Sequence, residues 1–198
     1  MSDDEAVLAL GSAQAGHLVT AANGRLTSTF VPFLVDDPAS TRLIAHIARA
    51  NPQRADIGEG VDGLMIVHGP DSYVSPSLYP SKVVTGEVVP TWVYTEIHVR
   101  GRVELVRDPE AIREIVSRLT DRMESDSATP WSIADAPDEF TNRLLRSIIG
   151  VSMTIDSIEG KAKLNQDDEP SDREAVAAWL SASDPVRASL GRAMSDRR

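Results

Sequence analysis

The sequence has no cysteine among its 198 residues, and aromatic side chains make up only 5% of it. Without cysteine the protein has no disulfide, no thiolate-ligated metal and no cysteine nucleophile. Because aromatic residues are few, those that fall inside a motif are candidates for contact with a flat ligand.

Long apolar runs and an excess of basic residues are also missing. No stretch of about 18 uncharged apolar residues occurs, so a transmembrane helix is not expected. The acidic start of the chain lacks the basic segment of a signal peptide, which favours a cytoplasmic protein. The formal net charge is −10, and no long run of Lys or Arg is present. This balance argues against nucleic acid as a partner.

The apolar pattern predicts one α+β domain built around a small antiparallel barrel. A content of 41% hydrophobic and 25% charged residues is ordinary for a globular domain. About seven apolar or alternating stretches indicate strands, and short turn sequences separate most of them. We therefore predict a single domain over 1–198, a barrel flanked by helices, with a helical tail from about residue 171.

Three local patterns carry sharper predictions. Ala22-Asn23-Gly24 predicts a hairpin turn, because Asn-Gly tolerates positive φ at both turn positions. Asp108-Pro109 predicts an N-cap followed by the first residue of a helix. The spacing of this helix places five residues on its buried face: Ile112, Ile115, Val116, Leu119 and Met123. A second helix is predicted over 138–149, and its inward residues are Phe140, Leu144, Leu145 and Ile148.

Two strand regions look interrupted. Gly69-Pro70-Asp71 separates an apolar strand over 63–68 from a brief strand over 73–75. Further along, 88–94 and 98–106 are predicted as two strands, of which the second alternates polar and apolar residues. These breaks predict a barrel of several short strands.

The stretch with the most suggestive chemistry is 46–53, His-Ile-Ala-Arg-Ala-Asn-Pro-Gln. It follows a predicted strand and contains Asn51-Pro52, which is typical of an N-cap with proline at the first helical position. The free N–H groups and the dipole at a helix start favour an anion. With His46 and Arg49 beside it, this corner is predicted to hold the charged end of a cofactor.

Four blocks of sequence, in order along the chain, resemble the PaiB-like family, which is usually described as FMN-binding negative transcriptional regulators. The resemblance extends from about residue 16 to residue 180, and four blocks in register make it specific. The blocks are Ala48-Arg49-Ala50-Asn51-Pro52-Gln53 after His46; Gly69-Pro70 with Tyr73-Val74-Ser75-Pro76-Ser77 and Tyr79; Val89-Pro90-Thr91-Trp92 with Tyr94, His98 and Gly101-Arg102; and Glu159-Gly160-Lys161-Ala162-Lys163-Leu164 with Gln166.

The resemblance implies a split β-barrel of the FMN-binding type, normally a homodimer with cofactor sites at the subunit interface. It implies FMN as the cofactor and a small molecule as the substrate. By analogy the barrel corner contributes His46, Arg49 and Asn51 to the pocket. The other implied contacts are Ser75, Tyr79, Lys82, Thr91, Trp92, Lys163 and Gln166, of which the last two could come from the partner subunit.

The resemblance leaves a second cofactor open. The piperazate synthases look like PaiB proteins but use b-type haem, and they form an N–N bond by cyclising N5-hydroxyornithine. Haem iron needs an axial ligand, most simply a neutral histidine. His46 is the candidate, and a metal-binding role is predicted for it only if the cofactor is haem. Its presence suits the flavin equally well, so it does not decide between them.

Three functions follow, in this order. The first is an FMN-binding oxidoreductase or a flavin-linked regulator, and the second is a haem-dependent cyclase of the piperazate-synthase kind. The third is a repressor that binds DNA directly, against which the charge argues. In the two enzyme readings the predicted catalytic residues are His46, Arg49 and Lys82. Each also has a structural interpretation: a histidine hydrogen-bonded within the barrel, and basic residues in surface ion pairs.

Overall fold

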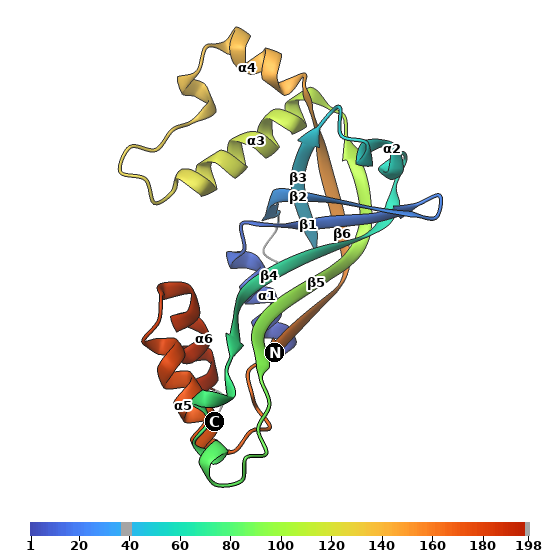
Figure 1. Ribbon diagram of the computed structural model, residues 1–198. Helices are drawn as coiled ribbons and strands as arrows, with labels where there is room; N and C mark the ends of the chain where they lie inside the picture. Colours follow the sequence, from blue (N-terminus) through green and yellow to red (C-terminus); the bar gives the residue numbers. More distant parts are fainter. Residues whose placement is uncertain (37–40, 197–198) are drawn as a thin grey trace. The chain divides into compact units, whose positions relative to one another are not determined.

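The computed structural model describes residues 1–36 and 41–196 (Figure 1). The chain forms two compact units. We call Ser2–Val67 with Ile97–Glu159 the barrel unit, and Met1, His68–Glu96 and Gly160–Arg198 the helical unit. The three longest strands each continue from one unit into the other along the chain. A single domain over 1–198 stays a prediction.

The barrel unit is organised by six antiparallel strands. They close in the order β1-β2-β3-β6-β5-β4, which confirms the predicted α+β split β-barrel, with six strands in the described residues in place of about seven. The strands are β1 (Ala15–Ala22), β2 (Arg25–Val35), β3 (Arg42–Ala48), β4 (Val61–Val74), β5 (Thr91–Val106) and β6 (Ile148–Lys163).

The predicted hairpin turn joins β1 to β2. Ala22 pairs with Arg25, and the two residues between them have φ values of 52° at Asn23 and 72° at Gly24. Both values lie in the left-handed region that a type I′ turn requires. The local sequence therefore sets the register of the first strand pair.

The interruptions predicted in β4 and β5 are wrong, because each is one continuous strand. Gly69 and Pro70 lie inside β4, and a Cβ added to Gly69 would come within 2.1 Å of Thr95 Oγ1. The glycine thus permits the close approach of a neighbouring strand rather than a turn. β5 runs without a break across the expected gap, with Val93 buried in the helical unit and Ile97 and Val99 buried in the barrel unit.

The core of the barrel unit is apolar. Its largest members include Leu18, Phe33, Leu43, Met65 and Met153, each at most 2% exposed. The short helix α1 (Asp3–Ser12) adds Leu10 to this core, and α2 (Gln53–Ile57) adds Ile57. On another face α3 (Pro109–Glu124) packs Ile115 and Leu119 against Leu34 and Ile44.

The start of α3 is confirmed: the Asp108 carboxylate accepts a hydrogen bond from Ala111 N at 2.9 Å. Ile112, Ile115 and Leu119 are buried as predicted. Met123, in contrast, is 40% exposed, so its predicted inward position is wrong. The helix covers the barrel only over its first three turns, and the apolar spacing continues beyond that contact.

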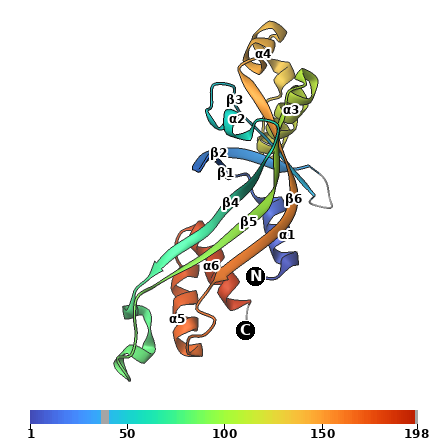
Figure 2. The same ribbon diagram turned by 90° about the vertical axis from the view of Figure 1, so that its right-hand side faces the viewer.

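The second predicted helix is shorter than expected. It is α4 (Asp138–Leu145), which adjoins α3 in the barrel unit (Figure 2), and Ile148 already belongs to β6, paired with Ala48. Phe140 and Leu144 are 44% and 49% exposed, so their predicted burial is wrong. Helical spacing shows which residues share a face, but it does not show whether another element covers that face.

The helical unit has a separate core. Two 3₁₀ turns, η1 (Pro76–Leu78) and η2 (Pro80–Val83), precede β5, and the chain ends in α5 (Pro170–Ser181) and α6 (Pro185–Ser195). A Cβ added to Gly191 of α6 would lie 2.7 Å from Ala177 O of α5, so the two helices pack closely. The buried residues of this core are Val74, Tyr79, Val93, Ala162, Leu164, Val176, Ala177, Leu180, Leu190 and Met194. No helix within the described ranges is long and apolar enough to cross a bilayer.

Candidate functional site

The barrel corner after β3 is held by two amide side chains. Asn51 Oδ1 accepts a hydrogen bond from Gln53 N at 2.9 Å, and Asn51 Nδ2 donates to Thr29 Oγ1 at 3.0 Å. Gln53 is fully buried, and its Nε2 donates to Leu18 O and Thr20 Oγ1 at 2.9 and 3.1 Å. The predicted helix start is thus present, but α2 has only five residues, and the Asn51 amide is occupied by its own chain at both ends.

His46 is the half-buried residue of this corner. It lies on the same face of β3 as Ile44, the face that packs against α3, and it pairs with Gly150 of β6. Burial lowers its pKa, so the imidazole is neutral near pH 7. His46 Nδ1 is buried and has no hydrogen-bond partner in the part of the chain that the structure describes. An unpartnered polar atom of this kind is costly and marks a place where a ligand could bind.

Arg49 follows the end of β3 and lines a cleft of about 260 Å³. Its Nε donates to Arg146 O at 3.0 Å, which directs the guanidinium across the start of β6. Three more arginines line this cleft with a single carboxylate, so its wall is strongly cationic. We call it the arginine cleft; its lining is Arg49, Arg107, Pro109, Glu110, Ile112, Arg113, Asn142, Leu145 and Arg146.

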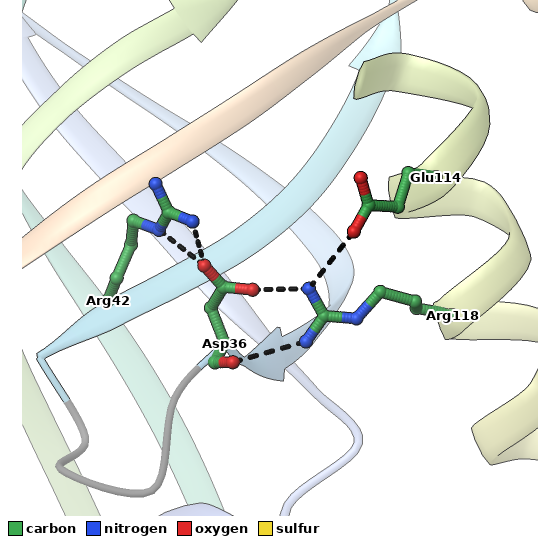
Figure 3. Close-up of polar contacts among 4 residues, drawn as sticks. All are labelled: Asp36, Arg42, Glu114 and Arg118. Atoms are coloured by element: carbon green, nitrogen blue, oxygen red, sulfur yellow. Dashed lines mark hydrogen bonds and ion pairs between the residues drawn. The ribbon is translucent and has the colours of Figure 1, made fainter. Parts of the chain in front are cut away.

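A different group of arginines in the barrel unit is fully paired. Arg42 and Arg118 both donate to the carboxylate of Asp36, and Arg118 Nη2 also donates to Asp36 O at 3.2 Å (Figure 3). Glu114 lies 3.9 Å from Arg118 on the same helix. Burial alone would raise the pKa of Asp36, but the hydrogen bonds and charges of Arg118 and Arg42 outweigh it and lower that pKa.

The helical unit contains a cavity of about 460 Å³, which we call the acidic cavity. Four predicted site residues line it, namely Tyr79, Thr91, Lys163 and Gln166. Lys163 is the one basic residue in the described lining, against five carboxylates. The rest of the lining is Ser81, Thr85, Glu87, Val88, Val89, Asn165, Asp167, Asp168, Glu169 and Asp172.

Two of the predicted residues in the acidic cavity serve the chain itself. Tyr79 is 7% exposed and belongs to the core, and its hydroxyl accepts a hydrogen bond from Asn165 Nδ2 at 3.1 Å. Burial, and then the charges of nearby carboxylates, raise the pKa of Tyr79. The Gln166 amide accepts from Leu164 N at 2.7 Å and donates to Ala162 O at 2.6 Å. Both side chains therefore shape the cavity wall.

Residues 2–157 of this chain match the model of a family described as "Putative FMN-binding domain". The chain belongs to this FMN-binding domain family. A relative in Bacillus subtilis, the protease synthase and sporulation protein PAI 2, is 26% identical over 166 residues, which cover 83% of this chain and 77% of the relative. The predicted resemblance to the PaiB-like family is thereby confirmed.

The chain is also similar to a fungal protein in sequence and to two solved structures in fold. An uncharacterized protein of Emericella nidulans is 28% identical over 184 residues, covering 76% of this chain and 73% of that protein. The solved FAD and heme binding protein of Mycobacterium smegmatis has a TM-score of 0.57 at 17% identity, covering 89% and 78% of the two chains. The flavocytochrome Anf3 of Azotobacter vinelandii has a TM-score of 0.54 at 15% identity, covering 87% and 73%.

Within this family member the predicted site residues fall into two sets. His46, Arg49 and Asn51 belong to the barrel unit, and the other seven belong to the helical unit. Among those seven, three do not line the acidic cavity. Ser75 caps η1 by accepting from Ser77 N at 3.3 Å, Lys82 is exposed on η2, and Trp92 is 48% exposed with its ring 6.1 Å from that of Tyr73.

Sequence reasoning missed Arg107, Arg113 and Arg146 of the arginine cleft, and it gave Gln53 no role. Arg107 and Arg113 flank the start of a helix that was predicted, so their proximity to each other could have been inferred. Arg146 is brought to Arg49 by the pairing of β3 with β6, in which Ala48 lies opposite Ile148, and to Arg113 by the packing of α4 against α3. No spacing along the chain reveals that pairing.

Proposed function

We propose that this chain binds a flavin, FMN in the first instance, through the barrel corner. The observation that carries the proposal is the neutral His46 with its buried, unpartnered Nδ1, close in sequence to Arg49, in a member of an FMN-binding domain family. A neutral imidazole can donate to or accept from the polar edge of a flavin ring. An arginine with two free terminal nitrogens can bind a phosphate in a bidentate way.

The charges of the two linings support placing the phosphate at the corner. Only Arg49 Nε is used within the described chain, so its terminal nitrogens are available to an anion. The acidic cavity is lined by five carboxylates and one lysine, which would repel a phosphate. We propose that Asn51 positions the corner rather than contacting the cofactor, because its amide is already hydrogen-bonded at both ends.

A bound flavin would supply hydride or single-electron transfer. We propose a homodimer that acts on a small molecule, either as an oxidoreductase or as a regulator that responds to the flavin. In this proposal Lys82, Trp92 and Ser75 contact the cofactor only in the assembled dimer, because they do not line the cavity of their own unit. The protein's own contribution is to bind and orient the flavin and to keep His46 uncharged.

A b-type haem is the second candidate, because the neutral state of His46 suits this cofactor as well. Burial lowers the pKa of His46, and a neutral imidazole is the form that binds iron. By their names, the M. smegmatis neighbour binds FAD and heme, and the A. vinelandii neighbour is a flavocytochrome. The corresponding activity would be the cyclisation of N5-hydroxyornithine, in which an N–N bond forms, the N–O bond breaks and water leaves.

The absorption spectrum of the purified protein separates these candidates. Oxidised flavin gives two broad bands, whereas histidine-ligated haem gives a Soret band near ~400 nm. We expect His46→Ala to weaken binding of the cofactor at least tenfold, by about 1.4 kcal/mol, in a fluorescence or absorption titration.

His68→Ala is the matched control, because His68 is 53% exposed and pairs with Asp71 at 2.8 Å in the helical unit. Its affinity for the cofactor should equal that of the unaltered chain. If His46→Ala binds FMN and haem as tightly as the control, the assignment of His46 is wrong. A chain that takes up neither cofactor would refute the proposed function.

A further inference from the structure

We infer that the arginine cleft is a binding site for a small anion that carries a phosphate or carboxylate group. Four arginines line this one cavity with only Glu110 as a lining carboxylate, in a chain whose net charge is −10. Arg49 is the residue that the cleft shares with the proposed flavin site, so the anion is either the phosphate of that flavin, in which case the inference rests on the proposed function, or a separate small molecule.

The partners of these arginines leave most of their charge unopposed. Arg146 has no hydrogen bond or ion pair through its side chain among residues 1–36 and 41–196, and Arg49 uses only Nε. Arg113 donates to the neutral Asn142 Oδ1 at 2.6 Å. Arg107 alone meets a carboxylate, that of Glu59 at 3.3 Å, and Glu59 is 95% exposed. An anion in the cleft would therefore relieve repulsion that the chain itself does not relieve.

The contrast with Asp36 shows that the fold can pair arginines when no ligand is needed. There, Arg42 and Arg118 converge on one carboxylate that is largely shielded from solvent (Figure 3). In the arginine cleft the converging groups meet the backbone oxygen of Arg146 and an amide oxygen instead. The place that a carboxylate fills in the Asp36 cluster is open to an external anion in the cleft.

Regular structure fixes the cleft on two sides. Arg49 follows β3 and Arg146 precedes β6, and Arg49 N donates to Ser147 O at 2.7 Å, which extends the pairing of the two strands. Arg107 and Arg113 flank the first turn of the 16-residue helix α3, whose positive end adds to the field. Paired strands and a helix hold the backbone of these four residues in place before the ligand arrives.

The size of the cleft limits the ligand. Its volume of about 260 Å³ is below the ~300–1,000 Å³ typical of sites for drug-sized ligands. Pro109, Ile112 and Leu145 add an apolar side to the lining. The ligand class is therefore a small phosphate or carboxylate compound, or the anionic end of a larger molecule.

Titration calorimetry with inorganic phosphate and, separately, with acetate tests this site at constant ionic strength. We expect one phosphate per chain, and at least tenfold weaker binding in both Arg146→Gln and Arg113→Gln. The control is Arg192→Gln, which makes the same change in charge at an exposed position of α6 and should keep its affinity within twofold. Circular dichroism melting verifies that each variant is folded.

A competition experiment identifies the source of the anion. The phosphate titration is repeated with the chain already mixed with FMN or with riboflavin, which lacks the phosphate. Competition by FMN alone means that the cleft receives the phosphate of the cofactor; no competition by either means a separate small anion. Both results support the site. Absence of phosphate and acetate binding, or equal affinity in Arg146→Gln, Arg113→Gln and Arg192→Gln, overturns it. A chain that binds phosphate but no flavin would refute the proposed function and leave this inference standing.

Discussion

The arginine cleft and the acidic cavity are lined by charges of opposite sign in one chain. The cleft in the barrel unit has four arginines and one carboxylate, and the cavity in the helical unit has five carboxylates and one lysine. The net charge of −10 is a sum over the whole chain and does not show the sign of the charge in either lining. The overall charge is therefore a sound argument against long nucleic acids, but it says nothing against a small anion in one cleft.

Two carboxylates, one in each unit, have pKa values that are shifted in opposite directions by their surroundings. Arg118 and Arg42 outweigh the effect of burial at Asp36 and lower its pKa. At Asp168, burial first, and then the charges of Asp172 and Asp167, raise the pKa. Lowering the pH should thus destabilise the folded state through Asp36 and stabilise it through Asp168.

The largest expected effect is that of Asp36→Asn. The change leaves Arg42 and Arg118 without their shared carboxylate, and we expect a loss of about 2 kcal/mol in the free energy of unfolding at pH 7. The estimate is moderate because the two arginine side chains are 53% and 37% exposed and regain water. Urea denaturation measures it, with Glu114→Gln, an exposed carboxylate beside Arg118, as the control.

The pH dependence of that loss tests its cause. The stabilisation by Asp36 is present above the ordinary pKa of an aspartate and disappears as the pH falls through its lowered pKa. The stabilities of the variant and the unaltered chain should therefore converge in acid. A difference that stays constant down to low pH would mean that packing, not charge, is responsible.

Asp172→Ala should have an intermediate effect in the helical unit. Asp172 is 6% exposed, and its carboxylate accepts hydrogen bonds from both Ser81 N, at 2.9 Å, and Ser81 Oγ. Removing it leaves the Ser81 N–H without its acceptor but also relieves repulsion from Asp168, so we expect a net loss of about 1 kcal/mol by urea denaturation. Asp167→Ala, at an exposed position of the same lining, should cost nothing. Equal losses would show that hydrogen bonding does not distinguish the two carboxylates.

The smallest expected effect has the opposite sign. Asp168→Asn removes a carboxylate whose ionisation is disfavoured in the folded state, and solvent screening limits the gain to about 0.3 kcal/mol at pH 7. The gain should develop as the pH rises through the ordinary and then the raised pKa, and it should vanish at lower pH. Thermal melting at several pH values measures it, and a loss of stability at pH 7 would contradict the proposed repulsion.

Local chemistry explains which structural features could be predicted from the sequence. Asn23-Gly24 and Asp108-Pro109 act within a few residues, and both behave as predicted. Gly69 was misread because a glycine that admits a neighbouring strand looks the same in sequence as one that turns the chain. Phe140 and Leu144 were misplaced because their exposure depends on elements far away in the sequence.

The candidate site was predictable in part. The motif around His46 identified a corner whose buried Nδ1 has no partner in the described ranges, and it identified Arg49 as a cation. The other three arginines depend on strand pairing and on the approach of α3, which no short motif encodes. The resemblance to a family indicated cofactor residues from both units. It did not show how the residues within each unit are arranged.

Because β4, β5 and β6 each run through both units, the order of translation affects the folding of the two units differently. The core of the helical unit combines Val74, Tyr79 and Val93 with Leu164 and Leu180, which are translated much later. As the ribosome works from the N-terminus, residues 68–96 emerge with an apolar surface whose partners do not yet exist. The barrel unit can close once Glu159 is out, whereas the helical unit must wait for the last helices, so chains that end prematurely near residue 160 should be the form most prone to aggregate.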